Sequence, residues 1–228
     1  MKITYLGHSC FTIETATARL IIDPFLTGNP AAAAKAADIR CDHVLCTHGH
    51  SDHIADAVEI AKRNNATIIA PVELAGYLGA QGARAHGMNL GGARQFPFGR
   101  VKLTLAHHSS SIEEGDPLAP VYLGPASGLL IEADGKKIHH AGDTALFLDM
   151  QLTARAGLDL VMLPIGDNYT MGPADALDAL DLLKPRLAIP MHYNTWPPIA
   201  QDAPAFAAAA RQRGHEVAPL KPGESVTL

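Results

Sequence analysis

The sequence predicts an α/β (α+β) fold in which two mixed β-sheets pack face to face and helices cover their outer surfaces, a four-layer αββα sandwich. In each half of the 228-residue chain, strand patterns come first and helical patterns follow, an order that fits sheets and helices layered around a core. The hydrophobic fraction of 47% is ordinary for a soluble globular protein, and many α/β folds of this length have one core. We therefore expect a single domain over residues 1–228.

The N-terminal half begins with short strand patterns separated by polar residues. Ile54, Val58 and Ala61 then follow helical spacing, which predicts a helix over residues 54–63. The segment 76–99 is rich in Gly, and we expect a loop there with at most short elements. The strands expected in this half cover residues 3–6, 11–14, 20–23, 43–47 and 67–70.

The C-terminal half contains two helical patterns. Pro173 and a leucine repeat predict a helix over 173–183, and an Ala-rich run predicts another over 203–213, ending before Gly214. Asp134-Gly135 is a favoured two-residue turn and joins two strands as a hairpin. The strands expected here cover residues 101–106, 128–133, 136–140, 158–163 and 186–190, with short strands around Val217 and Val226.

Composition excludes several classes of protein. The formal net charge is −5 and Lys and Arg form no run, so we expect neither nucleic acid nor an anionic membrane as a partner. Residues 1–8 alternate polar and apolar side chains, unlike a signal peptide, and three cysteines without a Cys-x-x-Cys pair favour reduced thiols. We expect a cytoplasmic protein that acts on a small molecule, with a composition compatible with homo-oligomers.

The segment Thr47-His48-Gly49-His50-Ser51-Asp52-His53 concentrates residues that bind metals. In an extended chain, His48, His50 and Asp52 project to one side, and His53 begins the next helix. Imidazole and carboxylate ligands suit a divalent metal such as zinc, and imidazole also suits iron. Isolated histidines in a polar loop are commonly only surface residues, but this spacing between an apolar strand and an amphipathic helix favours a metal site.

Further candidate ligands follow later strand patterns: His107 and His108, then Asp143 in a Gly-Asp-Thr turn, then His192. Functional side chains are often gathered on loops at a sheet edge. Taken singly, Asp143 is also an ordinary turn residue and His192 an ordinary structural histidine. The spacing leaves open whether His107 or His108 is the ligand.

The order of these motifs resembles the metallo-β-lactamase superfamily over nearly the whole chain. Flanking motifs are similar to those of small predicted metal-dependent hydrolases related to the L-ascorbate-6-phosphate lactonases. They are Tyr5-Leu6-Gly7-His8-Ser9, Ile22-Asp23-Pro24, His108-Ser109-Ser110-Ser111, His140-Ala141-Gly142-Asp143-Thr144, Leu163-Pro164-Ile165-Gly166-Asp167 and His192-Tyr193-Asn194-Thr195.

The resemblance implies a metallo-β-lactamase fold and a dinuclear metal centre. His108 directly precedes the serines, as in the family's pattern, which favours it over His107. In this assignment one metal is held by His48, His50 and His108, the second by Asp52, His53 and His192, and Asp143 bridges the two. We expect Asp23 to hold ligand imidazoles from behind, and His8, His140 and Asn194 to lie behind the ligands or to line the pocket.

Two divalent ions that share a water molecule lower its pKa from 15.7 towards about 7, which would supply a bridging hydroxide. We expect Zn²⁺, with Mn²⁺ or Fe²⁺ as alternatives, and we expect Asp52 to be the catalytic residue that orients the nucleophile and accepts its proton. The predicted reaction is cleavage of an ester, lactone or phosphodiester bond in a small polar substrate.

The alternative function is that of a diiron or mononuclear iron redox protein with the same fold. Flavodiiron proteins usually carry Glu where His50 stands, and mononuclear iron oxygenases use fewer ligands of the second metal. The presence of Asp52, His53 and His192 therefore favours the hydrolase.

Overall fold

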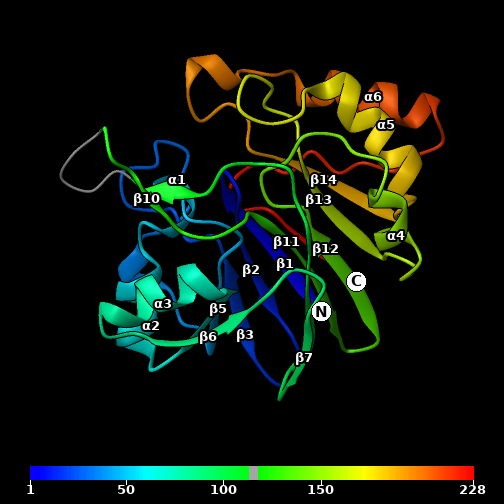
Figure 1. Cartoon of the computed structure of the whole chain (residues 1–228). Coiled ribbons are helices and arrows are strands. Elements are labelled where there is room, and N and C mark those ends of the chain that lie inside the picture. Colours follow the sequence, from blue (N-terminus) through cyan, green and yellow to red (C-terminus); the bar gives the residue numbers. More distant parts are fainter. Residues whose placement is uncertain (113–117) are drawn as a thin grey trace.

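Two β-sheets form the centre of the molecule in the computed structural model, which describes residues 1–112 and 118–228 (Figure 1). The first sheet has the spatial order β15 (Ser225–Thr227), β1 (Lys2–Gly7), β2 (Cys10–Glu14), β3 (Arg19–Ile22), β4 (His43–Leu45), β5 (Thr67–Pro71) and β6 (Arg84–Met88). The second has the order β14 (Leu187–Met191), β13 (Leu160–Pro164), β12 (Lys136–His140), β11 (Ser127–Ala133), β8 (Gly99–Leu105) and β7 (Ala93–Phe96). Both sheets are mixed: the hairpin strands pair antiparallel, whereas β3–β4–β5–β6 and β12–β13–β14 pair parallel.

The core between the sheets arises from period-2 alternation. Ile3, Tyr5, Phe11 and Ile13 point from β1 and β2 towards the second sheet, where Leu129 and other apolar residues of β8, β11 and β13 meet them. Because alternate residues of a strand face opposite sides, the remaining apolar side chains are available to pack against helices. The predicted packing of two sheets face to face is confirmed.

Helices cover the outer face of each sheet (Figure 1). Helices α2 (Ala57–Asn64) and α3 (Val72–Ala80) pack on the first sheet through Ile60, Leu74 and their neighbours. Helices α4 (Met150–Ala154), α5 (Pro173–Leu183) and α6 (Ala203–Gln212) pack on the second sheet through a separate cluster that includes Leu180 and Phe206. The four-layer αββα arrangement therefore matches the predicted fold class.

The two ends of the described chain meet at one edge of the first sheet. β15 pairs antiparallel with β1, with Ile3 opposite Val226, and the strand expected around Val217 forms only an isolated bridge to Ala188. The small hairpin β9 (Ser111–Ile112) and β10 (Val121–Tyr122), which the sequence did not predict, stands out from the body of the molecule (Figure 1).

The predicted helix over 54–63 is wrong in its boundaries. The structure has α1 (Ser51–Ile54) and then α2, with a break at Asp56, whose φ and ψ are −107° and 4°. The Asp56 carboxylate accepts hydrogen bonds from the backbone N–H groups of Leu26 and Thr27, at 2.7 and 2.8 Å. The break allows this side chain to hold a distant loop, which periodicity alone cannot reveal.

The segment 76–99, predicted as a loop with at most short elements, contains two short strands and also part of a helix that was not predicted. The segment contains most of α3 and all of β6 and β7. Gly lowers helix propensity by about 1 kcal/mol relative to Ala, but Leu74 and Leu78 of α3 are buried in the core of the first sheet. Tertiary packing therefore outweighs the propensity of Gly76 and Gly79. The helix over 173–183 is confirmed at both ends as α5.

Candidate metal centre

The candidate site lies at one end of the β-sandwich, where strands of both sheets end. The turn after β4 carries His48 and His50, and α1 carries Asp52 and His53. The second sheet contributes His108 after β8, Asp143 after β12 and His192 after β14. Residues as far apart in the sequence as His48 and His192 thus meet because their strands end at the same edge.

One correction concerns the backbone of the first motif. Asp52 does not continue an extended run from His48 and His50, since α1 begins at Ser51 and His50 is its N-terminal flanking residue. Asp52 therefore points from a helical turn, and its carboxylate lies beside His192 and His8 rather than beside His48. Because the backbone conformation changes after His50, the motif contributes to two groups of side chains. His48 and His50 belong to the first group, and Asp52 and His53 belong to the second.

The first group contains three converging imidazoles. Nε2 of His48 lies 3.1 Å from Nδ1 of His50, and Nε2 of His108 lies 3.3 Å from the same atom. His48 is fully buried, and burial holds its pKa well below the ordinary value. Neutral imidazoles present lone pairs, and three lone pairs directed at one point form a donor set suited to a divalent transition metal.

The second group contains Asp52, His53 and His192. Nε2 of His192 lies 3.9 Å from Oδ2 of Asp52. The ring of His53 is stacked on that of His192, with centroids 5.8 Å apart. These residues, together with His8, place one potential ligand atom each within 4.8 Å of one another.

Asp143 lies between the two groups. Its Oδ2 is 3.0 Å from Nε2 of His192 and 3.3 Å from Nε2 of His53, and 3.6 and 3.9 Å from Nε2 of His108 and His48. Burial would raise the pKa of this carboxyl, but His192 and His53 hold it well below its ordinary value. The buried carboxylate of Asp143 is thus in contact with both groups of side chains.

Unpaired buried atoms provide a test of whether this centre suits a metal. Among the residues that the structure describes, Oδ1 of Asp143 and Nε2 of His53 are buried without a hydrogen-bond partner. Such atoms are costly when they remain unsatisfied. Both belong to the candidate ligands, so a bound cation would satisfy them. The donor set and these unpaired atoms therefore fit a divalent metal.

Asp23 sits behind two of the histidines. Its Oδ2 accepts a hydrogen bond from Nδ1 of His53 at 2.8 Å and another from the hydroxyl of Thr47 at 2.7 Å. The Thr47 oxygen in turn accepts a hydrogen bond from Nδ1 of His48 at 2.9 Å. With Nδ1 held by these partners in both rings, Nε2 of His48 and of His53 is directed into the centre, where a bound metal would replace any proton on it.

Thr47 is not among the site residues predicted from the sequence. Its position beside His48, at the end of an apolar strand, could have indicated that its hydroxyl lies close to the ligands. Ser110 was named only as part of the His108-Ser109-Ser110-Ser111 motif. Its Oγ accepts a hydrogen bond from the backbone N–H of Gly49 at 3.0 Å and so fixes the turn between the two histidines. Ser109 Oγ lies 3.2 Å from Nε2 of His50, which leaves Nδ1 of that ring directed at its two neighbours.

The three other residues predicted near the ligands, and His107, occupy different positions. His8 is buried, and its Nε2 donates a hydrogen bond to Oδ2 of Asp52 at 3.1 Å. His140 is also buried, but it contacts backbone atoms: Nε2 donates to the Ser9 carbonyl, and Nδ1 accepts from the N–H of Gly142. His140 thus supports the turn that carries Asp143.

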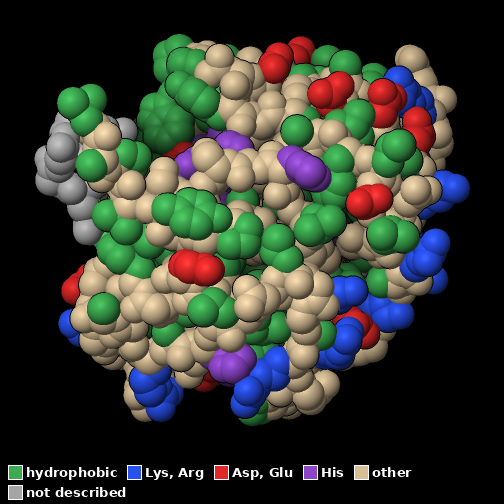
Figure 2. Space-filling view, viewed as in Figure 1, with side chains coloured by type: hydrophobic (Ala, Val, Ile, Leu, Met, Phe, Trp, Pro, Cys, Tyr) green, Lys and Arg blue, Asp and Glu red, His purple; other side chains and the backbone are tan. Residues whose placement is uncertain are grey.

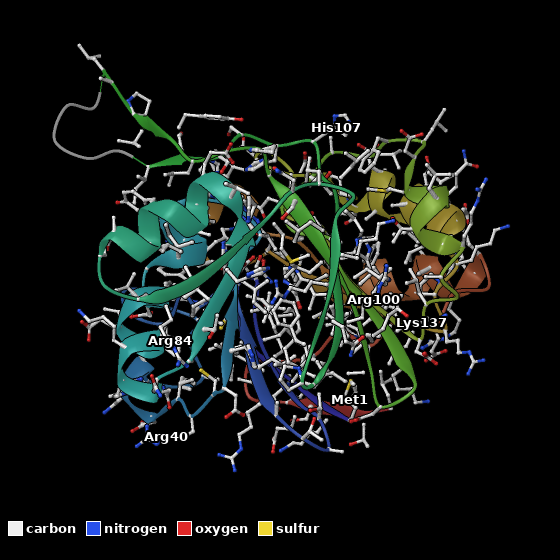
Figure 3. The ribbon with its side chains drawn as sticks, turned by 60° about the horizontal axis from the view of Figure 1, so that its bottom comes forward. Met1, Arg40, Arg84, Arg100, His107 and Lys137 are labelled. Carbon is white, nitrogen blue, oxygen red and sulfur yellow. The ribbon has the colours of Figure 1, made fainter. Side chains whose placement is uncertain are left out.

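Asn194 and His107 point away from the cluster. Asn194 is exposed and its Oδ1 accepts a hydrogen bond from the backbone N–H of Gln201. The ring of His107 packs on Phe147, with centroids 4.6 Å apart, at the upper edge of the molecule in Figure 3. Between the two adjacent histidines, the structure brings His108 to the other candidate ligands.

Comparison with known proteins agrees with this fold and site. A family model described as the beta-lactamase superfamily domain matches residues 2–192. The chain therefore belongs to the β-lactamase superfamily, and its structure is a metallo-β-lactamase fold.

More specific relatives are metal-dependent hydrolases. A UPF0173 metal-dependent hydrolase of Opitutus terrae is 50% identical over 228 residues, and one of Geobacillus thermodenitrificans is 51% identical over 229 residues, each match covering the whole of both chains. The solved structure of Igni18, a metallo hydrolase from Ignicoccus hospitalis, is 37% identical with a TM-score of 0.89, covering 100% of this chain and 97% of that one. The chain is a metal-dependent hydrolase of the UPF0173 family.

Proposed function

We propose that the protein hydrolyses a small polar substrate with a dinuclear metal centre. The observation that carries this proposal is the position of Asp143, whose Oδ2 lies 3.0–3.9 Å from the Nε2 atoms of four histidines in two groups. A single ion cannot satisfy two separate sets of three ligands. A carboxylate placed between the sets is the expected arrangement for two ions.

The proposed ligands divide as the two groups do. The first ion is assigned to His48, His50 and His108, and the second to Asp52, His53 and His192, with Asp143 shared. Two divalent ions at such a centre would acidify a water molecule and polarise a carbonyl or phosphoryl oxygen of the substrate. Nitrogen donors combined with carboxylates favour Zn²⁺, and Mn²⁺ or Fe²⁺ can occupy the same ligands.

Asp52 is proposed as the residue that accepts the proton. Its side chain is 25% exposed, whereas that of Asp143 is 2% exposed, so a substrate can approach Asp52. Burial tends to raise its pKa, but His53 and the hydrogen bond from His8 hold it below the ordinary value. Asp52 is therefore ionised at neutral pH, and its oxygens can orient a nucleophile and take up its proton.

The surroundings of the centre favour a small substrate without a large negative charge. Among the described residues, the ion pairs of Lys and Arg involve carboxylates outside the centre. Figure 2 shows Lys and Arg gathered mainly at the right and lower edges of this face, away from the histidine side chains in its upper part. Simple esters, lactones and phosphodiesters match such a site.

A substrate panel tests the proposal. Protein loaded with zinc or manganese is assayed on esters, lactones, phosphodiesters and thioesters, with His50→Ala as the blank and His86→Ala as the matched control, since His86 lies on β6 outside the centre. We expect turnover of one bond type that disappears in His50→Ala and persists in His86→Ala. Equal turnover by His50→Ala, or full activity without metal, contradicts the proposal.

Metal analysis tests the number and the kind of ions. We expect about two equivalents of a colourless ion in the wild-type protein and fewer in Asp143→Ala, because removal of the shared carboxylate weakens both positions. A coloured iron centre that changes its spectrum on reduction would instead favour the redox alternative.

A further inference from the structure

We propose that Thr195 and His8 form a buried chain of hydrogen bonds that positions the Asp52 carboxylate, with Thr195 as its anchor. The proposal rests on the role of Asp52 in the proposed function. It assigns a positioning role to Thr195, a residue that contributes no ligand atom to the groups of potential metal ligands.

The chain is short and enclosed. Nδ1 of His8 lies 2.8 Å from Oγ1 of Thr195, and Nε2 of His8 lies 3.1 Å from Oδ2 of Asp52. His8 is 0% exposed and Thr195 is 6% exposed. Water therefore competes poorly for either ring nitrogen, and both hydrogen bonds are made within the protein.

The chemistry of the three groups fixes the direction of each hydrogen bond. An ionised carboxylate only accepts hydrogen bonds, so Nε2 of His8 must carry the proton directed at Asp52. The His8 ring is fully buried, and burial disfavours a charged imidazolium, so a ring with its proton on Nε2 has a lone pair on Nδ1. The Thr195 hydroxyl must then donate to Nδ1, and this bond selects the Nε2–H tautomer.

Backbone contacts prevent the ring from leaving this position. The carbonyl oxygen of His8 accepts hydrogen bonds from the N–H of His192 at 2.8 Å and from the hydroxyl of Tyr5 at 3.1 Å. His8 has a φ of 58°, a conformation that costs a non-Gly residue free energy and persists where the surroundings impose it. Its ring lies 4.1 Å, centroid to centroid, from that of His192.

These contacts also link the two sheets at the centre. His8 follows β1 in the first sheet, whereas His192 and Thr195 follow β14 in the second. Asp52 enters from α1, after β4. The Thr195 hydroxyl therefore connects Asp52, which belongs to the first sheet, with the loop that carries His192 in the second sheet. The orientation of the Asp52 carboxylate thus depends on the position of that loop.

A direct role of His8 as a metal ligand is the competing interpretation, since its ring lies within the second group of potential ligands. The two interpretations require opposite tautomers. A ligand nitrogen must be unprotonated, so metal binding through Nε2 would move the proton to Nδ1 and make Thr195 the acceptor. The positioning role keeps the proton on Nε2 with and without metal.

The test combines tautomer and affinity measurements. Long-range ¹H–¹⁵N correlation spectra of wild-type protein, metal-free and zinc-loaded, report which nitrogen of His8 is protonated, with His8→Gln used to assign the signal. Thr195→Val removes the hydroxyl at nearly constant volume, and Thr195→Ser is the matched control that retains it. Zinc affinity is measured by competition with a chromophoric chelator.

We expect Nε2–H in both wild-type spectra. We also expect Thr195→Val to bind the second zinc about 10- to 100-fold more weakly, the range typical for residues that orient ligands, and Thr195→Ser to recover most of that loss. Protonation at Nδ1 in the zinc-loaded protein, or equal second-zinc affinity in Thr195→Val and Thr195→Ser, overturns the proposal.

The two proposals can fail separately. If no substrate is found but the tautomer and affinity results are as expected, only the reaction class is at fault. If turnover depends on His50 but Thr195→Val matches Thr195→Ser, the hydrolase proposal survives and the positioning role fails. Should Thr195→Val not fold, the wild-type spectra alone decide the tautomer.

Discussion

Single carboxylates and hydroxyls determine which nitrogen of each histidine faces the centre. Asp23 holds His53 directly and His48 through Thr47, while Thr195 holds His8. A histidine presents a lone pair from one nitrogen only when the other nitrogen carries the proton, and the partner of that proton selects the tautomer. Residues without any ligand role can therefore control metal affinity.

Replacing Asp23 with Asn tests this control. Oδ1 of Asp23 accepts a hydrogen bond from the Thr47 backbone N–H, and Oδ2 accepts from the Thr47 hydroxyl and from His53. The Asn amide has one carbonyl oxygen and one N–H₂ group, so it cannot accept all three. We expect zinc affinity to fall about 10- to 100-fold, measured by chelator competition. Asp42→Asn is the control, because Asp42 accepts from the backbone of Arg19 at an exposed position. Equal affinities in the two variants would contradict the expectation.

His139 gives a pH-dependent stability separate from the metal centre. It is buried, its Nε2 lies 3.1 Å from the Thr104 hydroxyl, and burial lowers its pKa to about 3. Its pKa in the unfolded chain is about 6.5. As pH falls below that value, His139 binds a proton in the unfolded chain but not in the folded protein, so the free energy of unfolding decreases.

The expected loss from His139 between pH 7.5 and pH 5.5 is about 1.4 kcal/mol. Urea unfolding at both pH values measures it in the wild-type protein and in His139→Gln, whose amide can still bond Thr104 but does not titrate. The variant should lose less stability by that amount. Parallel losses in the two proteins would show that His139 is not the source.

At the scale of elements, strand ends bring the candidate ligands together, and close backbone contacts hold those ends. Gly166 follows β13, and a Cβ added there would lie 2.1 Å from the carbonyl oxygen of His192. No side chain fits without displacing the loop after β14. The glycine thus keeps two parallel strands close enough for His192 to reach Asp143.

Gly166→Ala is expected to displace His192. We predict a destabilisation of about 1–3 kcal/mol, as for other overpacked positions, together with weaker binding of the second zinc. Thermal unfolding and chelator competition measure the two effects. Gly76→Ala in α3 is the control, since a Cβ there meets nothing within 4 Å; it should stabilise the helix by about 0.5–1 kcal/mol and leave zinc binding unchanged.

At the scale of the molecule, the candidate centre lies between the two halves of the sandwich. The first sheet supplies His48, His50, Asp52 and His53, and the second supplies His108, Asp143 and His192. A metal bound by both sets links the halves.

In the part of the chain that the structure describes, no helix is long and apolar enough to cross a membrane. Homo-oligomerisation stays a prediction.

Removal of metal should therefore destabilise the whole protein. An ion present at 100 times its dissociation constant stabilises the folded state by about 2.7 kcal/mol, so chelation is expected to lower the melting temperature and added zinc to restore it. Calorimetry of the wild-type protein measures the change, and Asp143→Ala should respond much less. An unchanged melting temperature after verified metal removal would contradict a structural link through the metal.

Local patterns allowed much of the fold to be predicted. Proline and leucine spacing gave α5 with both boundaries, because a helix that begins with Pro and has one apolar face is defined locally. The segment 76–99 could not be predicted, because α3 depends on burying Leu74 and Leu78 against a sheet formed by distant residues. For the same reason the break at Asp56 depends on the loop at Leu26 and Thr27.

The sequence by itself determined the set of candidate ligands, because ligand type and the order of motifs are properties of the chain. It also determined the layered fold class, because strand and helix periodicities are local. Only the tertiary structure decided which ring nitrogen faces inward, that His108 rather than His107 joins the cluster, and that Thr47 and Thr195 lie behind it. Those features depend on distances of a few ångströms between strands far apart in the chain, and no local pattern encodes such distances.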